Sequence, residues 1–228
     1  LIYALLSNPY FVPGRNGTFL AIGSVSEPFH SLLVDATIDF IRESIETLGN
    51  PIQFSTKSVI SEELIDELWK ASKGVISPLI TIVTIKAHKL LEPKAPSPSR
   101  RFAFVKKLRE KGFKPHIFIR PVIPGISDFE ADELIENALK SGAEGIVVGD
   151  FRVSESILRR LQSVGYSTSR ISMRMKKSLK SGKQASVDVW RERKLVVTRA
   201  LKRGLIAHFR ACCANAYDHD VACWNLCW

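Results

Sequence analysis

Small and polar side chains gather where a short apolar run of alternating pattern ends. Gly23, Ser24, Ser26 and Glu27 close the run that begins at Phe19. A glycine lets a ligand come close to the backbone, and hydroxyl and carboxylate oxygens accept hydrogen bonds from an amine. The combination predicts a site for a ligand amine. A polar loop that caps the next helix would use the same residue types, so both interpretations stay open on spacing alone.

Lys57 ends a second apolar run and stands beside the hydroxyl groups of Ser55, Thr56 and Ser58. A flexible ammonium group among hydroxyl donors suits a carboxylate or a phosphate. The alternative is a lysine that is only solvated at the rim of a sheet.

Two further loops are stiffened by proline. Residues 91–101 hold Glu92, three prolines and Arg101, and residues 121–128 lead from two prolines and Gly125 into a helix start. Proline fixes the backbone angle φ, and a helix N-terminus offers backbone donors to an anion or to the edge of an adenine. We expect both loops to act as rigid walls of a binding site.

All four cysteines lie in the last 17 residues, at Cys212, Cys213, Cys223 and Cys227. Clustered cysteines in a reducing compartment favour a metal over disulfides, so an auxiliary iron–sulfur cluster or a zinc ion is expected there. The spacing matches no standard zinc pattern. The alternative is that Cys223 and Cys227 are small apolar side chains on one face of a helix.

The elements that must position these residues alternate along the chain. Apolar runs rich in β-formers predict strands, and segments with apolar residues at steps of three and four predict the helices between them. Predicted strands are 19–24, 52–55, 79–85, 116–121 and 145–149. Such β-then-α units imply right-handed crossovers and a parallel sheet, with ligands bound at the carboxyl ends of the strands. The fold class is α/β, and periodicity leaves open whether the sheet closes toward a barrel.

Helix starts carry local signals. Ser61 and Ser154 are expected N-caps, Ser97 or Ser99 opens the helix before Gly112, and Ser127 with Glu130 forms a capping-box pattern. After Gly165 the pattern weakens, apart from a helix expected over 187–202. We therefore divide the chain into a barrel part, 1–168, and a basic, Cys-rich C-terminal extension, 169–228.

Taken in order, four segments resemble the radical S-adenosylmethionine (SAM) superfamily, and within it the proteins related to spore photoproduct lyase, also called DNA repair photolyase-like. They are Gly-Ser-Val-Ser-Glu-Pro-Phe at 23–29, Ser-Thr-Lys-Ser at 55–58, the Leu-Glu-Pro-x-Ala-Pro-Ser-Pro run at 91–98 with Arg101, and Pro-Val-Ile-Pro-Gly-Ile-Ser-Asp at 121–128. The resemblance spans about 110 residues. It implies a partial (β/α)6 TIM-like radical SAM barrel that lacks its first strand.

The same resemblance implies a lyase-like enzyme in which a [4Fe–4S] cluster reduces SAM to a 5′-deoxyadenosyl radical, which takes hydrogen from a substrate. A flavodoxin or ferredoxin would supply the electron. Carried over by position, the methionine amine would be held by Gly23, Ser24, Ser26 and Glu27. The ribose and carboxylate would lie near Thr81, Thr84, Glu92 and Arg101, and the adenine would lie near Ile123 and Gly125. The carboxylate of SAM or of the substrate would lie at Lys57.

One departure from the family concerns the cluster. The motif Cys-x-x-x-Cys-x-x-Cys is absent from the 228 residues, and the first residue is Leu1 rather than Met. In the family the motif follows the first barrel strand. We therefore expect a chain truncated before or around this motif, with the cluster ligands upstream of Leu1.

Positive charge is concentrated in one segment. Between Arg170 and Arg203 there are twelve Lys or Arg residues and two acids, which accounts for the whole net charge of +10. Such a segment suits a nucleic-acid backbone, although a solvated face is the common alternative. The candidate nucleic-acid contacts are Arg174, Lys176, Lys177, Lys180 and Lys183.

Composition excludes some classes. The chain has 45% apolar and 25% charged residues, which is typical of a soluble globular protein and excludes a disordered tail or a collagen-like fibre. No apolar run approaches the roughly 20 residues of a membrane span, so we expect a cytoplasmic protein without a membrane partner. Two other functions remain open: a non-catalytic nucleic-acid-binding module, and a TIM-like barrel enzyme whose metal is held by the terminal cysteines.

Overall fold

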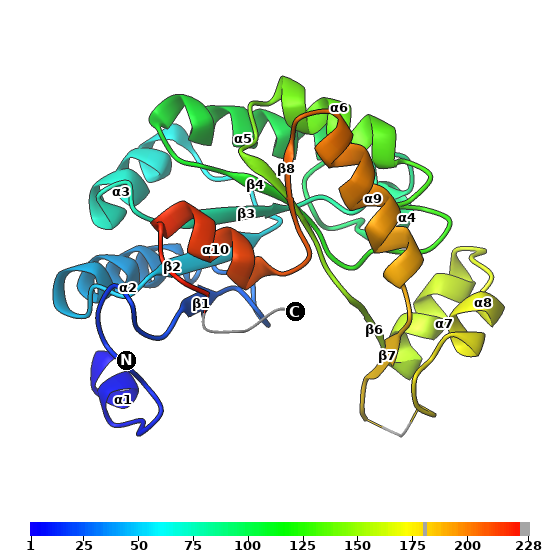
Figure 1. Ribbon diagram of the computed structural model, residues 1–228, viewed down its shortest axis with the longest axis horizontal. Coiled ribbons are helices and arrows are strands. Elements are labelled where there is room, and N and C mark those ends of the chain that lie inside the picture. Colours follow the sequence, from blue (N-terminus) through cyan, green and yellow to red (C-terminus); the bar gives the residue numbers. More distant parts are fainter. Residues whose placement is uncertain (180–181, 224–228) are drawn as a thin grey trace.

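Six parallel strands form the main sheet of the computed structural model, which describes residues 1–179 and 182–223. The sheet order is β1-β2-β3-β4-β5-β8, and every neighbouring pair is parallel. Figure 1 shows the sheet curving into an arc with most helices on its outer side. The strands are β1 Leu20–Ile22, β2 Ile52–Thr56, β3 Ser77–Thr81, β4 His116–Ile119, β5 Gly145–Val148 and β8 Ile206–His208.

Five longer helices cover the outer face of the arc (Figure 1). Side chains alternate across each strand, so Phe54, Ile80 and Ile117 point outward and are fully buried under these helices. The helices are α2 Val34–Thr47, α3 Glu62–Ser72, α5 Pro98–Lys111, α6 Ala131–Lys140 and α9 Trp190–Lys202, with the short α1 Ile2–Leu6 and α4 His88–Leu91 beside them.

A further helix, α10 Ala211–His219, lies on the inner side of the arc (Figure 1). Its Ala214 packs on the inward residues Leu79, Phe118 and Val147 of three neighbouring strands. This helix therefore fills part of the concave face and leaves the carboxyl ends of the strands accessible.

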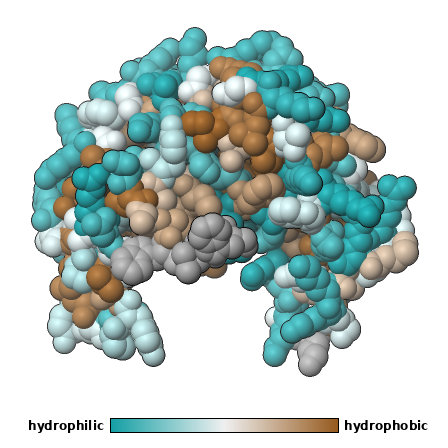
Figure 2. Space-filling view, viewed as in Figure 1, coloured by the Kyte–Doolittle hydropathy of each residue, from teal (hydrophilic) through white to brown (hydrophobic). Residues whose placement is uncertain are grey.

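Between β5 and α9 the chain forms an insert, defined here as residues 151–189. It contains an antiparallel pair, β6 Phe151–Val153 with β7 Ala185–Val187, and two helices, α7 Glu155–Ser163 and α8 Ser169–Met173. The insert has a small apolar core of its own that includes Phe151, Leu161 and Ile171. Figure 2 shows the molecule hollowed between the end that carries α1 and the largely hydrophilic surface of the insert.

All five predicted strands are present, and Ser61, Ser97 and Ser154 accept hydrogen bonds as N-caps. The predicted capping box is wrong. The α6 N-cap is Glu130, and the Ser127 hydroxyl donates to the Val83 carbonyl (2.8 Å) instead of capping a helix.

The last quarter of the chain differs most from expectation. The segment treated as an extension supplies α9 and the sixth strand β8, which pairs with β5. Val187 lies in β7, so the helix expected from residue 187 begins at Trp190. Strands β6, β7 and β8 have three residues each and were not predicted, because so short a segment shows little periodicity. Strand β1 is equally short, but it lies within the longer predicted run 19–24. Among the described residues, no helix is long and apolar enough to cross a membrane.

Candidate functional site

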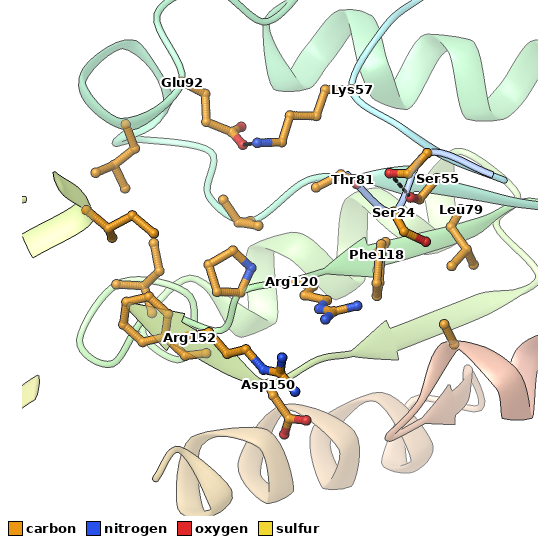
Figure 3. Close-up of a pocket in the computed structure, with 18 of the residues that line it drawn as sticks. Ser24, Ser55, Lys57, Leu79, Thr81, Glu92, Phe118, Arg120, Asp150 and Arg152 are labelled. Carbon is orange, nitrogen blue, oxygen red and sulfur yellow. Dashed lines mark hydrogen bonds and ion pairs between the residues drawn. The ribbon is translucent and has the colours of Figure 1, made fainter. Parts of the chain in front are cut away.

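A pocket of about 520 Å³ opens at the carboxyl ends of the strands, where a parallel sheet binds its ligands. Strands β1 to β4 and the loops after them form one wall, and the insert forms the opposite wall (Figure 3). Ala211, the first residue of α10, contributes to the lining from the concave face. The polar lining residues are Ser24, Gln53, Ser55, Lys57, Thr81, Glu92, Arg120, Asp150, Arg152, Arg160 and Gln184.

The loop after β1 is held tightly against the end of β2. Gly23 has φ +84°, and a Cβ atom placed there would lie 2.2 Å from the backbone oxygen of Ser55. The Ser55 hydroxyl donates to the Gly23 carbonyl (3.0 Å). The Glu27 carboxylate accepts from the Thr56 hydroxyl and from the Lys57 backbone N–H (3.0 Å). Glu27 thus fastens the loop, while Gly23 and Ser24 face the pocket.

A chain of polar contacts links four predicted residues beside the pocket. Glu92 accepts from Lys57 Nζ through one oxygen (2.7 Å) and from Arg101 through the other (2.8 Å). Arg101 also donates to the Thr81 carbonyl (2.6 Å), and its side chain is fully buried. Figure 3 shows Lys57 and Glu92 meeting above the pocket. Lys57 is therefore engaged by a protein carboxylate.

The two cations determine the protonation of Glu92. Burial raises the pKa of this carboxyl, but the nearby Lys57 and Arg101 outweigh burial and bring the pKa below its ordinary value. Glu92 is therefore charged at neutral pH, and it neutralises the buried guanidinium of Arg101.

The loop after β4 is fastened to the end of β3. Ser127 accepts from the Ile123 backbone N–H (3.1 Å), and Glu130 accepts from the Thr84 hydroxyl (3.0 Å). These bonds hold Ile123 at the pocket wall. Gly125 lies farther along the loop, where its N–H donates to Asp128 (2.6 Å).

Three arginines that line the pocket were not predicted from the sequence. Arg120 follows β4 directly, and a Cβ atom on Gly149 would come within 2.7 Å of its side chain, so Gly149 leaves room for it. Arg152 and Arg160 reach the pocket from β6 and α7 (Figure 3 labels Arg152). Arg120 could have been found from its position at the end of a predicted strand. No local sequence pattern indicates that the insert, with Arg152 and Arg160, lies over the pocket.

Of the eleven predicted cofactor residues, six line the pocket: Gly23, Ser24, Lys57, Thr81, Glu92 and Ile123. Glu27, Thr84 and Arg101 support these residues from behind through the bonds described above. Ser26 is exposed on the loop after β1, and Gly125 is not among the lining residues.

The predicted nucleic-acid residues belong to the insert. Lys176, Lys177 and Lys183 are exposed, whereas Arg174 is bound to Glu192 (2.5 Å). Lys180 lies outside the described residues.

The predicted metal residues partly converge. The Sγ atoms of Cys212, Cys213 and Cys223 all lie within 4.8 Å of one another. Cys227 belongs to the part of the chain that is not described.

Comparisons of sequence give distant relatives. No family model matches the chain. Uncharacterised proteins of Mycobacterium bovis and Mycobacterium tuberculosis are 22% identical over 153 residues, which are 64% of this chain and 45% of each relative. The matched region thus spans less than half the length of these relatives.

Comparisons of structure are more informative about the fold. Spore photoproduct lyase complexed with dinucleoside spore photoproduct superposes with a TM-score of 0.65 at 15% identity, covering 91% of this chain and 63% of that one. SuiB of Streptococcus suis, bound to S-adenosylmethionine, gives a TM-score of 0.52 at 17% identity, covering 84% and 39%. Both are radical SAM enzymes. The chain therefore shares the fold of spore photoproduct lyase and SuiB.

Proposed function

We propose that this chain is the SAM-binding part of a radical SAM iron–sulfur enzyme that acts on nucleic acid. One observation carries the proposal. Six residues from five separate segments, which the family resemblance assigned to SAM, line a single pocket at the carboxyl ends of the strands. The radical SAM fold of the structural neighbours supports the same conclusion.

The pocket suits the parts of SAM in turn. The backbone of Gly23 and the hydroxyl of Ser24 can accept hydrogen bonds from the methionine amine, since no Cβ separates a ligand from the Gly23 backbone. Thr81 and Glu92 offer oxygen acceptors for the ribose hydroxyls, and Lys57 offers a donor for the carboxylate. Ile123 provides an apolar surface for the adenine. In this proposal, Arg101 acts as a positioning residue that holds Glu92 and the Thr81 backbone.

The cluster does not fit onto residues of this chain. Its four cysteines do not form Cys-x-x-x-Cys-x-x-Cys, and Cys212, Cys213 and Cys223 lie on and after α10, which follows β8, the last strand of the sheet, instead of the first. The chemistry that a [4Fe–4S] cluster supplies in the family is one-electron reduction of SAM, with an electron from a flavodoxin or ferredoxin. The residues described here bind and orient SAM for that chemistry.

The insert side of the pocket supports a nucleic-acid substrate. Arg152 and Arg160 bring two guanidinium groups to the wall that the insert forms, and Arg120 adds a third from the loop after β4. Guanidinium groups bind phosphate oxygens through paired hydrogen bonds. One structural neighbour is complexed with a dinucleoside spore photoproduct. We infer that a segment of nucleic acid lies along the insert with a base directed into the pocket.

The test uses the complete natural protein, reconstituted anaerobically with iron and sulfide and supplied with a reductant and SAM. The expected product is 5′-deoxyadenosine, formed faster when the nucleic-acid substrate is present. A reconstituted protein that binds SAM but yields no 5′-deoxyadenosine above the uncatalysed background would contradict the radical assignment. A protein that binds no SAM would contradict the assignment of the pocket as well.

A further inference from the structure

Three thiols converge at the start of α10, outside the pocket residues described above. Cys212 and Cys213 lie in the first turn of this helix, and Cys223 lies four residues beyond its end. Their sulfur atoms are all within 4.8 Å of one another, and all three side chains are half-buried. From this geometry we propose that Cys212, Cys213 and Cys223 bind a single Zn²⁺ ion.

The fold brings Cys223 back to the helix start by a defined turn. Asp220 adopts the left-handed conformation (φ 52°), and the Val221 N–H donates to the Ala216 carbonyl (3.0 Å), which closes the helix and reverses the chain. Arg15 holds this turn by donating to the carbonyls of His219 (3.3 Å) and Asp220 (3.4 Å). The convergence therefore follows from the helix end and its anchoring.

The separation of the sulfurs fits one ion. Zinc binds thiolates at about 2.3 Å in a tetrahedron, which places any two sulfurs about 3.8 Å apart. A [4Fe–4S] cluster requires wider spacing, because each cysteine binds a different iron. A disulfide would join only two of the three sulfurs. A set of three thiolates is also a soft donor set, which favours zinc over magnesium or calcium.

The position at the start of α10 assists binding. A helix N-terminus carries a partial positive charge, which stabilises the negative charge of the thiolates there. The residue before Cys212 is Ala211, whose carbonyl accepts from the Gln53 side chain (3.0 Å) at the inner end of the pocket. An ion at these cysteines would join the segment after α10 to the helix start and so fix this helix across the concave face. The site is structural in this proposal and independent of SAM binding.

The first test counts metal in the protein purified without chelators. We expect about one zinc per chain. Titration of the wild-type thiols with a mercurial reagent should release this zinc to a chromophoric chelator as the cysteines react. This measurement needs no variant, so misfolding of a mutant cannot affect it. Release of no zinc, or a mass that shows the loss of two thiol hydrogens, would overturn the proposal.

The second test locates the ion. Loss of a side chain that only supports a metal ligand lowers metal affinity by roughly tenfold to hundredfold. We expect a larger loss of zinc affinity in each variant that removes a ligand: Cys212→Ser, Cys213→Ser and Cys223→Ser. Tyr217→Phe, on the same helix, is the matched control and should retain zinc. If the serine variants instead lose iron and acid-labile sulfide, the site holds a cluster and the single-ion proposal is wrong.

Discussion

Gly23 lies where the loop after β1 passes the backbone oxygen of Ser55. We predict that Gly23→Ala lowers SAM affinity by roughly a hundredfold, because the added methyl must move the loop by about 1 Å or more and misplace its acceptors. Equilibrium dialysis with labelled SAM measures this change.

The control for that variant separates collision from backbone strain. Gly204 has φ +76°, and a Cβ atom there meets nothing within 4 Å. Gly204→Ala should therefore cost about 1 to 2 kcal/mol of stability and leave SAM affinity unchanged. Equal loss of SAM binding in both variants would show that strain alone, and not the approach to Ser55, explains the effect.

Glu92 neutralises a buried guanidinium, so its charge matters for folding. We predict that Glu92→Gln lowers the free energy of unfolding at pH 7 by about 3 kcal/mol, because Arg101 keeps its buried charge and loses its anionic partner. Urea unfolding followed by circular dichroism measures this difference.

The pH dependence of that difference has a defined sign. The pKa of Glu92 is lower in the folded protein, so its stabilisation is present above the unfolded value of about 4.3 and is lost as pH falls through the folded pKa. The difference in stability between the two proteins should therefore begin to shrink only below about pH 4.3 and vanish once the pH falls below the folded pKa of Glu92. A difference that shrinks well above about pH 4.3, or that persists unchanged down to the onset of acid unfolding, would mean that the carboxylate charge is not responsible.

Sequence patterns predicted one side of the pocket and not the other. Gly23, Lys57 and Glu92 follow strands in short loops, where the carboxyl-end rule places them together. Arg101 was predicted to lie near the ligand, but it is buried behind Glu92, because the loop between them folds back on β3. Arg152 and Arg160 were missed, because their approach depends on how the insert packs, which no local spacing records.

At the scale of elements, the outer layers were predictable and the inner helix was not. Strands β2 to β5 are buried on both faces, and their apolar runs stand out in sequence. Helix α10 consists mainly of alanine and cysteine, with Asn215, Asp218 and His219 among them and no clear apolar stripe. It lies on the concave face, where Asp218 accepts from Ser77 and lies 2.9 Å from His116. Its polar side chains satisfy polar residues of the inner sheet, which hydrophobic periodicity does not report.

The half-buried His208 on β8 reports on this inner layer. Burial lowers its pKa to about 4, and the neighbouring His116 adds to the effect. Because the unfolded chain binds the proton more strongly, stability should rise with pH between about 4 and 6.5. We predict that His208→Gln makes this rise in stability shallower. Part of the rise should remain, because burial also lowers the pKa of His219.

Unfolding by urea at several pH values measures the slope. His30→Gln is the control, because His30 is exposed on the loop after β1. The interpretation fails if the His208 variant keeps the wild-type slope.

The insert is the element expected to contact nucleic acid. We predict that replacing Lys176, Lys177 and Lys183 by alanine weakens oligonucleotide binding and lowers the slope of log affinity against log salt. The slope should fall by about 0.7 to 0.9 for each of these lysines that neutralises a phosphate in the wild-type complex. Fluorescence anisotropy at several salt concentrations measures both quantities.

A matched control removes the same charge elsewhere. Lys70, Lys73 and Lys106 are exposed on and beside α3 and α5, on the outer side of the arc. Their replacement by alanine should leave the salt slope close to that of the wild type. Equal effects from the two triple variants would indicate attraction by net charge alone.

At the scale of the whole molecule, the charge is less segregated than the sequence suggests. Four arginines between 170 and 203 form ion pairs, and three of them reach acids that lie before this segment: Arg193 with Asp150, and Arg199 and Arg203 with Asp132 (2.9 and 3.1 Å). These contacts tie α9 to β5 and α6. The same segment therefore holds the arc together and carries the exposed lysines of the insert.

SAM is proposed to occupy the pocket between the strand ends and the insert. Hydrogen–deuterium exchange of the protein with and without SAM tests it most directly. We predict slower exchange in the three loop segments 22–27, 81–86 and 120–127, and unchanged exchange in α3 on the outer face. SAM-dependent protection that is absent from all three loops, or that falls on the outer face, would contradict the account.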